Sequence, residues 1–204
     1  MCRRSLEAVQ RELASAQVLI VGPGIGRSEA TQEFVMELLY QATVPVVLDA
    51  DGLYALSHDL SVLKKTKAPC VLTPHVGEMS RLTGLSAESI LGNMLETASR
   101  FSREQDVITV LKDARTIVAS PSGHTYINTT GCSALAKAGS GDVLTGLIAA
   151  FVAQGVDVPQ AAKLGVYIHG RAGERAAESR SEYGVVASDV ADSLPLVLAE
   201  LLRV

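Results

Sequence analysis

Short, uninterrupted apolar runs recur along the first half of the chain, and stretches with helical periodicity separate them. The runs end at Val21, Asp49, Thr73 and Lys112. A strand that is apolar at every position is buried on both faces, which is typical of a parallel sheet covered by helices on either side. The sequence therefore predicts an α/β fold with three layers and a mostly parallel central sheet.

The second half of the chain changes character. Residues 115–120 and 124–128 flank Pro121-Ser-Gly123 and predict a hairpin, which would add an antiparallel pair at one edge of the sheet. Helical spacing predicts the remaining elements at 6–13, 29–40, 74–82, 86–103, 142–154, 159–178 and 187–203. We find no internal repeat or linker and expect one domain over residues 1–204.

Composition excludes several classes of protein. The 204 residues carry a formal charge of -4, without the basic excess of a nucleic-acid binder. No run reaches the about 18 apolar residues of a membrane span, and the N-terminus lacks the apolar core of a signal peptide. The three cysteines, Cys2, Cys70 and Cys132, form no CxxC pair, which favours reduced thiols over a disulfide or zinc site. We therefore expect a cytoplasmic protein that binds neither nucleic acid nor membrane.

The segment Gly139-Ser-Gly-Asp142 opens directly into an apolar helix. Backbone N–H groups at a helix N-terminus, exposed by glycines, form a site for phosphate oxygens. A carboxylate at Asp142 could accept the proton of a substrate hydroxyl aimed at that phosphate. The alternative is that the glycines only turn the chain and that Asp142 complements the helix dipole.

Two further segments lie where open α/β sheets bind ligands, at the carboxyl ends of strands. Gly22-Pro-Gly-Ile-Gly26 follows the first strand but matches neither the Rossmann fingerprint nor a P-loop, so by itself it is a turn. Asp49 and Asp51 follow the second strand. Paired carboxylates could hold Mg²⁺ through water, or one of them could cap the next helical turn.

These segments together resemble the ADP/ATP-dependent NAD(P)H-hydrate dehydratase family of ribokinase-like proteins. The resemblance runs from about Ala16 to Leu202, and each of its motifs is short while their order is specific. It rests on the glycines of 22–26 and on Val47-Leu-Asp-Ala-Asp-Gly52, Leu72-Thr-Pro-His-Val-Gly-Glu78, Asn128-Thr-Thr-Gly131 and the Gly139–Asp142 segment.

The resemblance implies a ribokinase-like fold and an enzyme that uses ATP or ADP to dehydrate NADHX or NADPHX. Asp142 would be the catalytic base, and Gly139, Ser140 and Gly141 would form the anion hole. Asp142 would also contact the substrate, together with Gly24, Gly26, Asp49 and His75. Glu78 would organise Mg²⁺ through water. The implied assembly is a homo-oligomer, a tetramer in this family.

The resemblance also assigns the nucleotide to the segment after the fourth strand. The residues implied there are Lys112, Asp113, Ala114, Arg115 and Thr116, together with Gly141. Asp113 stands where the family has glycine, which removes backbone freedom and brings a carboxylate near phosphate. Cys132 and Ala134 also replace the family's asparagine and glycine. Cys132 is then a small filler rather than a nucleophile.

Two alternatives remain open at this point. A ribokinase-like kinase for a vitamin precursor, of the hydroxyethylthiazole or pyridoxine type, would share Gly139–Asp142 but not the Thr73–Glu78 segment. A catalytically impaired nucleotide-binding subunit would account for Asp113 and Cys132. Because only 21 residues precede Gly22, we also expect an N-terminally short version of the family domain. Such a chain would expose apolar surface and leave the substrate side more open than the nucleotide side.

Overall fold

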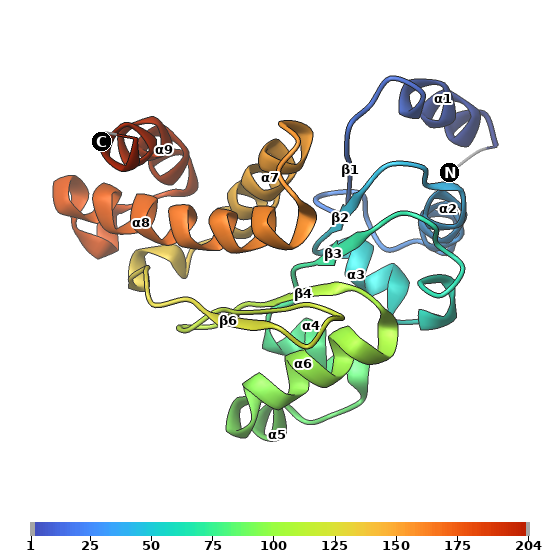
Figure 1. Ribbon diagram of the computed structural model, residues 1–204, viewed down its shortest axis with the longest axis horizontal. Coiled ribbons are helices and arrows are strands. Elements are labelled where there is room, and N and C mark those ends of the chain that lie inside the picture. Colours follow the sequence, from blue (N-terminus) through green and yellow to red (C-terminus); the bar gives the residue numbers. More distant parts are fainter. Residues whose placement is uncertain (1–2, 203–204) are drawn as a thin grey trace.

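The computed structural model describes residues 3–202 and contains one six-stranded sheet between two layers of helices (Figure 1). The strands are β1 (Leu19–Val21), β2 (Val46–Leu48), β3 (Cys70–Leu72), β4 (Ile108–Leu111), β5 (Ile117–Ala119) and β6 (Thr125–Ile127). They lie in chain order across the sheet. The first four are parallel, and β5 and β6 are antiparallel to their neighbours. The predicted fold class and hairpin are confirmed.

The helices follow the predicted alternation. They are α1 (Arg3–Leu13), α2 (Glu29–Gln41), α3 (Asp51–Leu56), α4 (Val76–Thr83), α5 (Ala87–Gly92), α6 (Met94–Gln105), α7 (Ser140–Ala153), α8 (Val158–Gly184) and α9 (Ala187–Leu201), with short 3₁₀ turns at Leu60–Val62 and Ser133–Leu135. No helix within residues 3–202 combines the length and apolarity needed to cross a bilayer.

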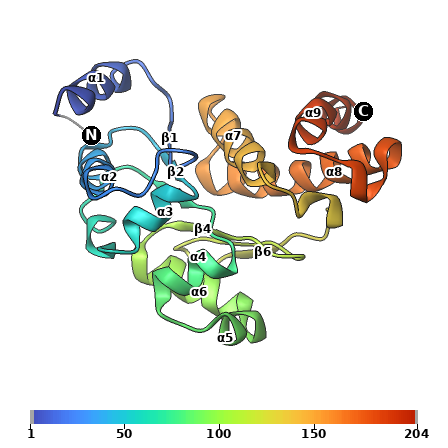
Figure 2. The ribbon, with the colours of Figure 1, turned by 180° about the vertical axis from the view of Figure 1, so that it is seen from behind.

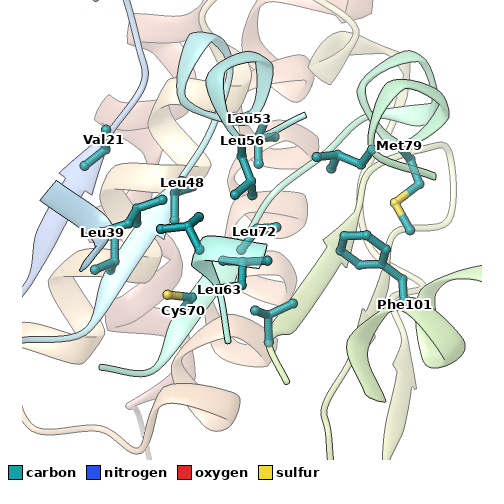
Figure 3. Packing of buried hydrophobic residues seen from close by; sticks show 14 of the residues in the cluster. Val21, Leu39, Leu48, Leu53, Leu56, Leu63, Cys70, Leu72, Met79 and Phe101 are labelled. Atoms are coloured by element: carbon teal, nitrogen blue, oxygen red, sulfur yellow. The ribbon is translucent and has the colours of Figure 1, made fainter. Parts of the chain in front are cut away.

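Sequential strand order decides which helices cover which face. Right-handed crossovers between neighbouring parallel strands place their helices on the same face of the sheet. The core on that face joins Leu48 and Leu72 to side chains of α2, α3, α4 and α6, including Leu39, Met79 and Phe101 (Figure 3). The opposite face of the sheet is covered by α7 and α8, which come from the C-terminal part of the chain.

The second core cluster lies on that opposite face. Val47, Val71 and Val110 pack there against Leu144 and Ile148 of α7 and against α8. A third cluster joins α7, α8 and α9 to one another, and these three helices form the layer on one side of the sheet (Figure 2). Glycines let α8 approach closely, since a methyl group at Gly165 would lie 2.5 Å from Ile148.

Several helix predictions were wrong: α1 begins at Arg3 rather than at residue 6, α3 was not predicted, and three other helices have different bounds. The helix expected at 86–103 is two helices, α5 and α6, because Asn93 leaves the helical region at φ -152°. The helix expected from Asp142 begins at Ser140, since Gly139 adopts a left-handed conformation at φ 86° and serves as its N-cap. The helix expected to end at residue 178 runs to Gly184, with a break at Ser181.

Strand β1 lies at the edge of the sheet, where apolar surface is exposed. Ile20 is 43% exposed, on a strand that pairs only with β2 among the described residues. The two described cysteines, Cys70 and Cys132, are free, and Cys2 lies outside residues 3–202.

Candidate active site

The segments singled out in the sequence meet at the carboxyl edge of the parallel strands. Two glycines allow the loops after β1 and β2 to touch through their backbones. A methyl group at Gly22 would lie 1.7 Å from the carbonyl oxygen of Asp49, and one at Gly52 would lie 2.7 Å from that of Val21. Neither contact tolerates a side chain, so these glycines are needed for close packing. The next two loops, at His75 and Lys112, form a parallel bridge.

The N-terminus of α7 faces this edge and has the geometry of an anion site. The N–H of Ser140 donates to the carbonyl of Lys137 at 3.2 Å. Those of Gly141 and Asp142 lie in the same first turn, where an α-helix provides no internal acceptor. They are therefore the groups available to an anion, and the helix dipole favours negative charge there.

An ion pair between a buried carboxylate and a partly exposed ammonium lies directly beneath the anion site. Asp49 is 2% exposed and accepts from Lys112 Nζ through Oδ1 at 2.8 Å, and from Thr145 Oγ1 through Oδ2 at 2.8 Å. A methyl group at Gly141 would lie 3.3 Å from Lys112 Nζ and 3.5 Å from Asp49 Oδ2. Because Gly141 has no side chain, the backbone of α7 packs directly against Lys112 and Asp49.

His169 supports the same turn from α8. Its Nε2 lies 2.9 Å from the carbonyl oxygen of Ser140 and 3.2 Å from the Ser140 hydroxyl. A carbonyl oxygen only accepts, so Nε2 carries the proton. Burial lowers the pKa of His169 to about 4, and the charge of Lys112 acts in the same direction, while the Ser140 carbonyl opposes them. The imidazole is therefore neutral near pH 7.

The His75–Glu78 segment forms a complete helix cap. His75 Nδ1 accepts from the N–H groups of Gly77 and Glu78 at 2.9 and 3.3 Å, and Glu78 Oε2 accepts from the His75 N–H at 2.9 Å. This capping box fixes the start of α4. Gly77 makes room for the folded imidazole, since a methyl group there would lie 2.9 Å from the ring.

A cavity of about 1010 Å³ opens beside these groups, between the sheet edge and α8. His75, Lys112 and Gly141 line it, as do the other four residues expected to bind the nucleotide, 113–116. Arg115 and Lys137 add positive charge to its wall. The structure thus brings the predicted nucleotide segment and part of the anion hole into one cavity that is large enough for a nucleotide.

Apart from Ser140, which also lines that cavity, the other predicted site residues lie outside it. Asp142 is exposed on the first turn of α7, and Gly24 and Gly26 are exposed in the loop after β1, where an added methyl group would meet nothing within 4 Å. Asp51 accepts from the Gly26 N–H at 3.1 Å and from Arg27 Nε at 2.6 Å, so it holds the glycine loop.

Two supporting residues were missed in the sequence. Thr145 follows Asp142 by three positions and looks like one of several small residues of an apolar helix. His169 lies on the buried face of α8, between Gly165 and Gly173, where a polar side chain among small residues was the available signal. Neither residue belongs to a motif.

A sheet covered on both faces, with a glycine-rich helix start at its ligand edge, defines a ribokinase-like protein. A solved ribokinase-like superfamily protein of Enterococcus faecalis has this fold, with a TM-score of 0.82 and 25% identity over 97% of this chain and 68% of its own. The sequence carries the assignment further. A family model described as NAD(P)H-hydrate dehydratase matches residues 1–196, and the chain belongs to that family.

Two relatives within that family show how similar this chain is to known members. The bifunctional NAD(P)H-hydrate repair enzyme of Moorella thermoacetica is 47% identical over 201 residues, which are 98% of this chain and 38% of that protein. The ADP/ATP-dependent NAD(P)H-hydrate dehydratase of Bacillus subtilis, co-crystallised with ATP and Mg²⁺ and soaked with CoA, has a TM-score of 0.81. It is 32% identical, with 93% of this chain and 70% of that chain covered.

Proposed function

We propose that this chain uses ATP or ADP to dehydrate NADHX or NADPHX and so restores NADH or NADPH. One observation carries the proposal. Gly141 lines the same cavity as the Lys112–Thr116 segment, and the exposed carboxylate of Asp142 follows on the same helical turn. A nucleotide in the cavity would direct its phosphates at the N-terminus of α7, with the base next to the point of transfer. The two relatives named above support the same substrate class.

The chemistry follows from these positions. Asp142 accepts the proton of the ring hydroxyl, whose oxygen attacks the terminal phosphorus and releases the shortened nucleotide. The ring carbon–oxygen bond of this phosphate ester then breaks, inorganic phosphate leaves with the bonding electrons, the neighbouring ring carbon loses a proton, and the dihydropyridine double bond is restored. The N–H groups of Gly141 and Asp142 stabilise charge on the transferred phosphoryl group. His75 and the loop of Gly24 and Gly26 contact the substrate.

Magnesium would arrive with the nucleotide. Within residues 3–202 no three His, Cys, Asp or Glu side chains are grouped to hold a metal. Mg²⁺ commonly binds through phosphates, water and only one or two carboxylates, so this donor set fits a nucleotide-bound ion. Glu78 uses Oε2 in the helix cap, and its Oε1, which lies 3.6 Å from His75 Nε2, would be the oxygen that orients a metal-bound water. The bound ion would neutralise phosphate charge.

The test is an assay with NADHX, Mg²⁺ and either nucleotide, followed at the NADH absorbance band. We expect nucleotide-dependent recovery of NADH. A hydroxyethylthiazole or pyridoxine-type kinase would instead leave NADHX unchanged and phosphorylate its alcohol. Nucleotide binding with neither reaction would identify an impaired subunit, the reading that Asp113 and Cys132 favour.

We also propose that the chain forms a cytoplasmic homo-oligomer, a tetramer. The free thiols of Cys70 and Cys132 suit a reducing compartment. Exposed Ile20 on the edge strand is apolar surface of the kind that association covers. Light scattering of the purified chain measures its mass directly, and a monodisperse monomer would contradict the proposed assembly.

A further inference from the structure

Asp49 is the buried carboxylate of the ion pair beneath the anion site. Family resemblance assigns it to the substrate, but both of its oxygens already accept hydrogen bonds, and it is 2% exposed. It does not line the cavity, whereas Lys112 does. A carboxylate whose two oxygens both have partners and which is almost entirely buried acts through those partners.

The hydrogen bonds of Asp49 connect three separate parts of the fold. Lys112 follows β4, Asp49 follows β2, and Thr145 lies on the second turn of α7. An ammonium group has three donors, and within residues 3–202 the only acceptor found for Lys112 Nζ is Asp49. Two donors therefore remain for a ligand. The ammonium also lies 3.3 Å from where a Gly141 methyl group would be, which is next to the N–H groups of the anion site.

A lysine side chain has four rotatable bonds and loses much freedom when its ammonium is fixed. A buried carboxylate that already holds the ammonium in place removes that cost from the binding step. Burial also strengthens the attraction, since screening by water is weak there. Thr145 satisfies the second oxygen, Oδ2, and the ammonium is held by Oδ1.

We propose that Asp49 is a positioning residue that holds the Lys112 ammonium against the anion hole, where its two remaining donors meet nucleotide phosphate. The inference rests on the proposed nucleotide site but not on the dehydration reaction. It assigns Asp49 to the phosphate side of the site. Asp49 therefore affects affinity for phosphate groups and leaves adenosine recognition unchanged.

The experiment compares the affinities of ADP with Mg²⁺ and of adenosine for the full chain, by calorimetry. The ratio of the ADP affinity to the adenosine affinity gives the contribution of the phosphates to binding. Asp49→Asn keeps the volume but not the charge, and it should lower this ratio about tenfold, as expected for a hydrogen bond to a charged group. Lys112→Met should lower it at least as much. The double variant should fall no further, because the two residues act as one unit.

Thr145→Val is the matched control, since it removes the other bond to the same carboxylate and keeps the ion pair. Its ratio should stay within about twofold of the wild-type value, whatever its thermal midpoint. An equal loss in Thr145→Val and Asp49→Asn would show general anchoring of α7 and overturn the proposal. Additive losses in the double variant, or an unchanged ratio in Asp49→Asn, would also overturn it.

A second measurement avoids the risk that Asp49→Asn does not fold. The Nζ–H signal of Lys112 in the wild-type chain, assigned by its loss in Lys112→Met, should shift with ADP and not with adenosine. An unmoved signal overturns the proposal. Phosphate-dependent binding without NADHX turnover refutes the proposed reaction but supports the role of Asp49. A wild-type chain that binds ADP no better than adenosine refutes both.

Discussion

At the scale of single residues, the start of α7 combines an exposed carboxylate with a buried imidazole. Asp142 lies on the surface of the first turn, and His169 supports the Ser140 carbonyl from below. The Asp142 carboxylate is accessible to a substrate, whereas the His169 imidazole is fixed by its buried contacts. Substitutions at the two positions should therefore separate chemistry from stability.

Asp142→Asn should leave the fold intact and remove most turnover. An exposed side chain contributes little to the core, while loss of a general base typically costs about 10²–10⁴-fold in rate. Steady-state kinetics with NADHX and circular dichroism measure the two effects. A variant within about threefold of wild type would contradict the assignment of Asp142 as the base.

His169 should make the chain less stable in acid. Its folded pKa of about 4 lies below its ordinary value of 6.5, so the folded state disfavours the protonated form. The stability is complete above pH 6.5 and is lost as the pH falls toward 4, by on the order of 3 kcal/mol. Urea unfolding across this range measures the loss.

The control for this prediction is His169→Gln, which keeps a donor for the Ser140 carbonyl but does not titrate there. This variant should show a flatter dependence of unfolding free energy on pH between 6.5 and 4. Identical slopes in both proteins would mean that other groups cause the acid sensitivity.

At the scale of elements, the capping box of α4 explains why His75, Gly77 and Glu78 occur together. The imidazole caps the helix, the glycine makes room for it, and the glutamate returns the bond. A role in stability therefore coexists with the proposed substrate contact. The two roles need different substitutions to be told apart.

His75→Ala should lower the unfolding free energy by about 1 kcal/mol, because it removes the N-cap acceptor. His75→Asn should retain most of that stability, since asparagine is a favourable N-cap residue. Thermal unfolding of both variants tests the cap. If His75 also contacts the substrate, the Michaelis constant for NADHX should rise in both, and an unchanged constant in both would leave only the cap.

At the scale of the whole molecule, the cavity joins the sheet edge to the helical layer. Its walls come from the loops after β3, β4 and β6 and from α7 and α8. A ligand that contacts all of them stabilises the folded chain, since the unfolded chain has no such site.

Nucleotide with Mg²⁺ should therefore raise the thermal midpoint. At about 100 times the dissociation constant, the added stability is about 2.7 kcal/mol. Gly141→Val should abolish the rise, because its side chain would meet the Lys112 ammonium and block the approach of phosphate. Differential scanning fluorimetry measures both proteins. An unchanged rise in the variant would assign the nucleotide to another site.

Much of the fold was predictable because its signals are local. Each buried strand is a continuous apolar run, and the Pro121–Gly123 turn marks the hairpin between β5 and β6. The nucleotide segment at 112–116 was likewise found from the resemblance, and the cavity lies along it. Predicted helix boundaries were wrong where the backbone conformation of a single residue sets the end of the helix, as at Asn93 and Gly139.

The sequence by itself determined the α/β class, the edge hairpin and the glycine-rich start of α7, because periodicity and turn chemistry act over a few neighbouring residues. Only the tertiary structure decided that Asp49 holds Lys112, 63 residues away, and Thr145, 96 residues away. It also decided that His169 lies under Ser140. Such contacts depend on how sheet and helices pack around a shared core, and no short stretch of sequence contains that information.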